Sequence, residues 1–150
     1  MRSFEWCPQE IAEGCAAVVA HSHICITTPA YRLITPRCGR TTLNLVFYDL
    51  DPEAIRRTNA YADDPEQGQL VIDGCMQESH AMAIAKFVRD THADATVIIN
   101  CEAGISRSPG VVLALRRFYG GDTEEPYKRA HPNMHVTSML TRVLRSADPE

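Results

Sequence analysis

The chain has 150 residues, of which 45% are hydrophobic and 23% charged, and this is the size and balance of one globular domain. We therefore expect a single domain over residues 1–150 with one core. The formal net charge of −4 provides no global basic field, which argues against nucleic acid and anionic membranes as partners. Any anion-binding site must therefore be local.

The cysteine and histidine patterns do not indicate a metal site or a disulfide framework. The six cysteines are at least eight positions apart and form no CxxC pair. His21 and His23 share a face of an expected strand, but no third ligand is evident, so we expect no metal and no cofactor. The first residues lack the basic start and apolar run of a signal peptide, and no apolar stretch has the length of a membrane span. We expect a soluble, cytoplasmic protein with reduced thiols.

The first third of the chain predicts one helix and two strands. Pro8 to Ala17 has a proline in its first turn, followed by apolar residues at helical spacing. His23 to Thr28 reads HICITT and Thr42 to Tyr48 reads TLNLVFY, and both alternate strand-forming residues. The second strand is followed directly by Asp49.

The middle of the chain predicts a loop and then a helix. Residues Asp51 to Gln69 are polar and contain two Asp-Pro turn signals, so we expect an exposed loop with room for a helical turn. Asp73 is expected to open the following helix as its cap. Met76 to Thr91 places apolar residues at steps of three and four, which is typical of an amphipathic helix packed on a sheet.

The last third predicts a buried strand followed by helices. Thr96 to Asn100 reads TVIIN, which is typical of a central strand covered on both faces. Gly110 to Tyr119 predicts a helix that two glycines end, and two further helices follow, one opened by Asp122 or Thr123 and one from His135 to Arg145. The sequence therefore predicts an α/β fold with a mixed, largely parallel sheet of four or five strands flanked by helices.

The segment between the TVIIN strand and the next helix carries the candidate chemistry. Cys101 and Arg107 stand six positions apart with Gly104 between them. A loop at a helix N-terminus can point successive amides at an anion, and the helix dipole adds positive potential. Arg107 can hold two oxygens of a phosphoryl group with its planar guanidinium, and the same environment favours the thiolate of Cys101. We expect this site at the carboxyl end of the strand.

The segment CEAGISRS resembles the CxxGxxRS form of the signature of the protein tyrosine phosphatase superfamily, in particular its compact dual-specificity branch. The apolar strand before it and the helix after it make the resemblance more specific. The strand ending at Asp49, the helix of Met76 to Thr91 and the segment HPNMHVTSML also resemble elements of that family, so the resemblance covers the chain from about residue 42 to its end. One departure is Asn100, because the family usually has histidine before the cysteine.

The resemblance implies a phosphatase with a phosphocysteine intermediate and the family's fold. Cys101 would attack phosphorus, Arg107 would bind the phosphoryl group, and Ser108 would donate a hydrogen bond to the leaving thiolate. The partners would be a phosphorylated protein and, in the loop, oxyanions such as phosphate, sulfate or vanadate. Backbone amides would complete the phosphate cradle in the segment that consists of Glu102, Ala103, Gly104, Ile105, Ser106 and Arg107.

A general acid is also required, to protonate the leaving oxygen and then to activate water. Asp49 follows its strand in the register of the family's acid, so we favour Asp49, with Asp51 as the alternative. Asp49 precedes Cys101 by 52 positions, which implies an insertion after the acid. That insertion contains Asp63 and Asp64, either of which could serve instead.

Other functions remain open on the sequence alone. The main alternative is a phosphate-binding pseudophosphatase, a recognition module without turnover, and arsenate reduction or sulfur transfer are more distant ones. Phosphoinositide hydrolysis is disfavoured because the loop has Glu102 and no lysine, which favours a singly phosphorylated protein side chain over a multiply phosphorylated lipid. The adjacent arginine pairs Arg56–Arg57 and Arg116–Arg117 are expected on solvated faces and receive no role.

Overall fold

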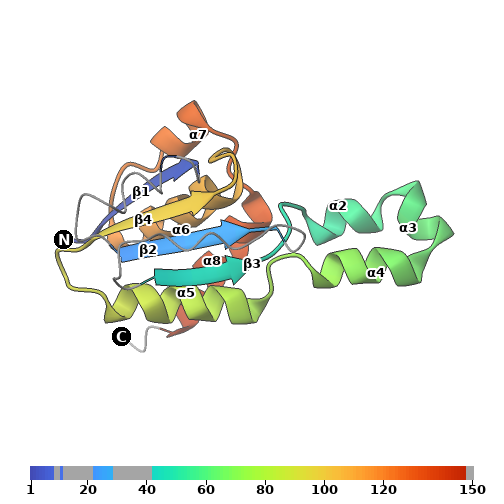
Figure 1. Cartoon of the computed structure of the whole chain (residues 1–150), viewed down its shortest axis with the longest axis horizontal. Helices are drawn as coiled ribbons and strands as arrows, with labels where there is room; N and C mark the ends of the chain where they lie inside the picture. Colours follow the sequence, from blue (N-terminus) through green and yellow to red (C-terminus); the bar gives the residue numbers. More distant parts are fainter. Residues whose placement is uncertain (9–10, 12–21, 29–41, 148–150) are drawn as a thin grey trace.

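A four-stranded parallel sheet forms the centre of the molecule (Figure 1). The computed structural model describes residues 1–8, 11, 22–28 and 42–147. The described strands are all parallel and lie in the order β1-β4-β2-β3. Their bounds are β1 Ser3–Pro8, β2 Ser22–Thr27, β3 Thr42–Val46 and β4 Thr96–Cys101. The α/β class was predicted, and the four described strands agree with the predicted four or five, whereas the expected mixed character is not seen among these strands.

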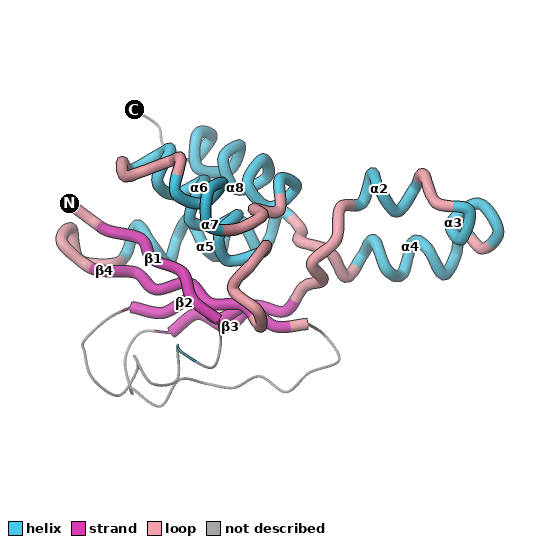
Figure 2. The backbone as a smooth tube through the Cα atoms, turned by 90° about the horizontal axis from the view of Figure 1, so that it is seen from above, coloured by secondary structure: helices cyan, strands magenta, loops and turns pink. Residues whose placement is uncertain are grey.

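Three long helices cover one face of this sheet (Figure 2). They are α5 Glu78–Asp90, α6 Arg107–Tyr119 and α8 Met134–Ala147, with the short α7 Glu125–Arg129 between the last two. Apolar side chains of the strands and helices, including Ile24, Ile99 and Leu140, form one buried cluster. The helices and strands predicted for this part of the chain are confirmed to within a few residues. None of the described helices is both long enough and apolar enough to cross a membrane.

The N-terminal strand β1 was not predicted. Ser3–Pro8 pairs with β4 over its whole length, from Ser3 opposite Thr96 to Pro8 opposite Cys101. Pro8, expected to start a helix, is the last residue of β1, where the missing N–H costs least. Ile11 is helical, and the rest of the predicted helix lies outside the described residues.

Residues 51–73 form three helices instead of the expected loop, and we call them the helical arm. They are α2 Pro52–Arg56, α3 Asn59–Asp63 and α4 Pro65–Asp73, and they extend away from the sheet beyond β3 (Figure 1). The Asp-Pro pairs mark helix starts rather than turns. Asp51 and Asp64 accept hydrogen bonds from the amides of Glu53 and Gln67, and each proline occupies a first-turn position.

The helix that follows the arm does not begin at Asp73 as predicted. Asp73 is the last residue of α4, where its carboxylate accepts a hydrogen bond from Gln69. Gln77 occupies the N-cap position of α5, and its amide donates to His80 Nδ1. The short helix predicted after Gly121 is present as α7, but its N-cap position is Glu124 and not Asp122 or Thr123, although Asp122 accepts hydrogen bonds from the amides of Glu124 and Glu125.

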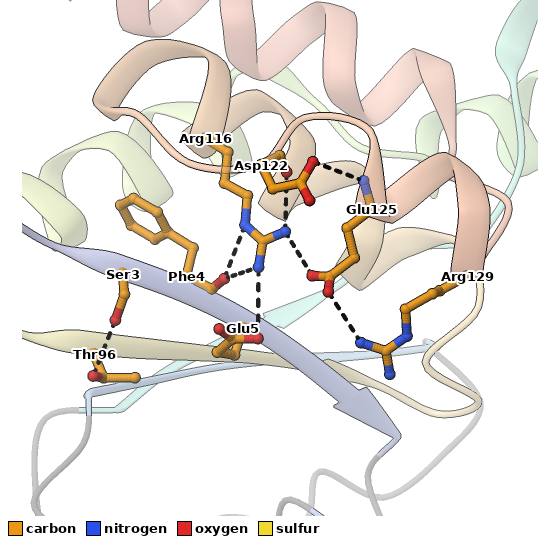
Figure 3. Close-up of polar contacts among 8 residues, drawn as sticks. All are labelled: Ser3, Phe4, Glu5, Thr96, Arg116, Asp122, Glu125 and Arg129. Carbon is orange, nitrogen blue, oxygen red and sulfur yellow. Dashed lines mark hydrogen bonds and ion pairs between the residues drawn. The ribbon is translucent and has the colours of Figure 1, made fainter.

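Arg116 lies in the interior, which corrects its expected place on a solvated face. Its Nε and Nη2 donate to the carbonyl of Phe4 at 3.1 and 2.7 Å, and its Nη1 donates to Glu125 at 2.8 Å and to the carbonyl of Asp122 at 3.1 Å (Figure 3). Glu5 forms an ion pair with it at 3.5 Å. The guanidinium therefore ties β1 to α6 and α7.

We predict that Arg116→Ala lowers the free energy of unfolding by about 3 kcal/mol, because it leaves a buried carbonyl and a carboxylate without their charged donor. Urea unfolding followed by circular dichroism measures this loss. The control is the exposed neighbour Arg117→Ala, which should change stability by less than about 0.5 kcal/mol. Equal losses in the two variants would contradict a structural role for Arg116.

Candidate functional site

The candidate site is the loop between β4 and α6. Cys101 is the last residue of β4 and Arg107 the first of α6, so the loop consists of the five residues Glu102 to Ser106. Gly104 has a φ of +69°, and a Cβ there would lie 2.6 Å from the backbone nitrogen of Pro8. Only glycine fits both the conformation and the space, because β1 ends directly against the loop.

The thiol of Cys101 lies at the start of α6. Cys101 is only 2% exposed, and its Sγ is 3.1 Å from the hydroxyl oxygen of Ser108. The amide of Ser108, in the first turn of α6, donates to the same sulfur at 3.5 Å. The sulfur therefore lies within hydrogen-bond distance of both the amide and the hydroxyl of Ser108, at the N-terminus of α6.

Arg107 is buried, with 5% of its surface exposed, and its guanidinium is held from several sides. Nη1 donates to the carbonyl of Phe47 at 2.9 Å and to the hydroxyl of Thr28 at 3.2 Å. Nη2 lies 3.7 Å from Glu102 Oε1. Nε is buried and makes no hydrogen bond to any residue that the structure describes. A guanidinium held in place on a loop at a helix N-terminus is suited to bind an oxyanion.

Glu102 connects the loop to the end of β2. Its Oε1 accepts a hydrogen bond from the amide of Thr28 at 2.9 Å and pairs with Arg107. Partial burial alone would raise the pKa of Glu102, but the hydrogen bonds from Thr28 and the charge of Arg107 outweigh burial and lower this pKa below its ordinary value. Sequence reasoning gave Glu102 a backbone role and used its charge to disfavour multiply phosphorylated substrates, but it missed the contacts with Thr28 and Arg107. The available signal was an acid and an arginine in the same short loop.

Asp49 reaches the loop from the segment after β3. Its Oδ1 accepts hydrogen bonds from the hydroxyl of Ser106 at 2.7 Å and from the side-chain amide of Asn133 at 2.9 Å. Asn133 also donates its backbone amide to the carbonyl of Ser106 at 2.9 Å, which fixes the turn before α8 against the loop. Sequence reasoning noted this turn but missed the contact with Asp49, which depends on tertiary packing.

The other candidate acids lie in the helical arm or at its start. Asp51 and Asp64 cap helices of the arm, and Asp63 ends α3. Asn100 is buried in β4, and its Oδ1 has no hydrogen-bond partner in the described part of the chain. His23 is buried in β2, and His21 lies outside the described residues. Within the described ranges, no group of three or more His, Cys, Asp and Glu side chains could hold a metal ion.

The arrangement brings together a thiol, a buried cation and a carboxylate from distant parts of the sequence. These groups can bind an oxyanion, attack it and exchange a proton with it. Comparisons of the chain with protein-family models, with curated proteins and with solved structures found no match. Any functional assignment therefore rests on the residues of the site and their contacts.

We predict that Glu102→Gln lowers stability at pH 7 and that the difference from the wild type shrinks as the pH falls. A carboxyl group whose pKa is lowered by folding contributes stability above its unfolded pKa of about 4.3 and loses that contribution as it becomes protonated in the folded state. Urea unfolding between pH 3 and pH 7 measures the difference. Glu124→Gln, at an exposed position, is the control. A stability loss that stays constant over this range would contradict the pairing of Glu102 with Arg107.

Proposed function

We propose that the chain is a cysteine-dependent phosphatase that hydrolyses phosphotyrosine, and also phosphoserine or phosphothreonine, in proteins. The observation that carries the proposal is the buried Arg107, held by Phe47 and Thr28 and with its Nε free, on the same loop as a buried thiol. The resemblance of CEAGISRS to the signature of the protein tyrosine phosphatase superfamily supports it.

In the first step, the Cys101 thiolate attacks phosphorus and the bond to the leaving oxygen breaks. Arg107 and the loop amides hold the phosphoryl oxygens, and Asp49 gives its proton to the leaving oxygen. Ser106 and Asn133 both donate to Oδ1 of Asp49, so Oδ2 is the oxygen that makes no hydrogen bond to a described residue and can carry this proton. The products of this step are the free hydroxyl compound and phosphocysteine.

In the second step, water attacks the phosphocysteine and the sulfur–phosphorus bond breaks. The Asp49 carboxylate takes a proton from the water, and inorganic phosphate leaves. The Ser108 hydroxyl, 3.1 Å from Sγ, donates to the sulfur as its negative charge returns. This step leaves Cys101 and Asp49 in their starting states.

The loop's charge favours a substrate with a single phosphate. Its one charged side chain between Cys101 and Arg107 is Glu102, which stays ionised because its pKa is lowered. An extra phosphate near this carboxylate would meet like charge. The mechanism also needs a reduced thiol, which a reducing compartment such as the cytoplasm provides.

We expect Cys101→Ser to reduce the turnover of an aryl phosphate by at least about 1,000-fold, because a serine hydroxyl is a poor nucleophile at neutral pH. The variant should still bind phosphate, detected as a rise in melting temperature, whereas Arg107→Ala should lose both binding and turnover. If the wild type binds phosphate but shows no turnover, the chain is a phosphate-binding pseudophosphatase. Turnover by Cys101→Ser near the wild-type rate would rule out the covalent mechanism.

The role of Asp49 can be tested by the dependence of rate on the leaving group. Asp49→Asn should slow hydrolysis of an alkyl phosphate by about 100-fold or more and that of an activated aryl phosphate far less, because a good leaving group needs no proton. The basic limb of the pH–rate profile should flatten. Asp51→Asn, which alters the cap of α2, is the matched control. Leaving-group dependence in Asp51→Asn, Asp63→Asn or Asp64→Asn instead would place the acid in the arm.

A further inference from the structure

The helical arm of residues 51–73 begins and ends beside the candidate site. It starts two residues after Asp49, which contacts Ser106 of the loop. It returns to the body at Gly74, whose carbonyl accepts a hydrogen bond from the amide of Tyr48 at 2.7 Å, and Tyr48 also forms a parallel bridge with Cys75. Both ends of the arm are thus fixed at the carboxyl end of β3, next to the proposed phosphate cradle.

The faces of the arm do not pack against the part of the body that the structure describes. Figures 1 and 2 both show α2, α3 and α4 extending away from the sheet and its covering helices. Ile72 is the one fully buried side chain of the arm, while Leu70 is 65% exposed. The ring of Tyr61 lies against Gly68, so the arm folds mainly on itself. Its surface is available to a partner.

The arm carries all of the net charge of the chain. It has six acidic residues and two arginines, a net charge of −4, and the whole chain also has a net charge of −4. The remaining residues therefore have no net charge. Arg56 is already paired with Glu53 at 2.8 Å. The carboxylates of Asp63 and Glu66 make no hydrogen bond or ion pair that the described structure records, so they are available for cations from outside.

We propose that the helical arm docks a basic segment of the phosphorylated protein substrate, an inference that rests on the proposed phosphatase function. A negative arm beside the cradle repels a doubly negative phosphoryl group unless lysines or arginines accompany it. In the proposed function the phosphoryl group binds at the loop that carries Cys101 and Arg107, and the arm then meets the residues that flank it. The exposed Leu70 can contact the aliphatic part of a lysine or arginine side chain.

Alternative occupants fit the arm less well. A second copy of the chain would bring a second arm with a net charge of −4, and nucleic acid or an anionic membrane would also bring negative charge.

The length of the arm also sets the spacing in the substrate. The nine residues of α4 span about 13 Å, which an extended peptide covers in about four residues. Asp63 and Glu66 lie at the end of α4 that is far from Gly74, so the basic residues should begin at least about four positions from the phosphorylated residue.

The test compares two phosphotyrosine peptides with one core sequence, which carry either lysines or glutamates from the fourth flanking position outward. The wild type should have a kcat/KM at least about tenfold higher for the lysine peptide at low ionic strength, and this preference should shrink in high salt. The arm variant Asp63→Asn with Glu66→Gln should lose most of the preference. The control Asp90→Asn with Asp94→Asn makes the same change in charge at the amino end of β4 and should keep it.

Turnover of an aryl phosphate by the wild type separates this inference from the proposed function. If the wild type does not hydrolyse it, the phosphatase proposal fails. If the wild type hydrolyses it but cleaves the two peptides at rates within about threefold of each other, only the docking role of the arm fails. A lysine preference that the arm variant and the control variant reduce equally would also overturn the docking role, because the effect would then come from total charge.

Discussion

The buried positive charge of Arg107 is the constraint on which the rest of the site depends. A guanidinium does not give up its proton in a protein, so its burial has to be matched by acceptors. These acceptors are the Thr28 hydroxyl after β2, the Phe47 carbonyl after β3 and the Glu102 carboxylate after β4. The strand order β4-β2-β3 places the three carboxyl ends side by side. The parallel sheet and the proposed anion site are therefore parts of one arrangement.

The elements with strong local patterns could be predicted from the sequence, and β1 could not. Thr96–Cys101 has three consecutive apolar β-branched residues and Glu78–Asp90 repeats its buried side chains at helical spacing, so each pattern identifies its element without knowledge of a partner. Ser3–Pro8 has Glu5 and a final proline, and its main stabilisation comes from pairing with β4, some 93 positions away. Local sequence does not contain that information.

The arm and the site contacts show a second limit of sequence reasoning. An Asp-Pro pair is equally suited to a turn and to the start of a helix, because the aspartate accepts from nearby amides and the proline has a fixed φ in both cases. The loop from Cys101 to Arg107 could be located from spacing alone. The contacts of Asn133 with Asp49 and of Thr28 with Glu102 could not, since they join segments 84 and 74 positions apart.

The contact between Gly104 and Pro8 has a consequence for the order of folding. Pro8 lies at the end of β1, and β1 has its pairing partner only after residues 96–101 have been made. During synthesis β1 therefore cannot pair with β4 until this later segment has been made. Pairing across such a long loop is slow because closing the loop has a high entropic cost. Because the loop from β4 to α6 packs on Pro8, the proposed anion cradle is completed only when β1 pairs with β4, a strand that lies much later in the sequence.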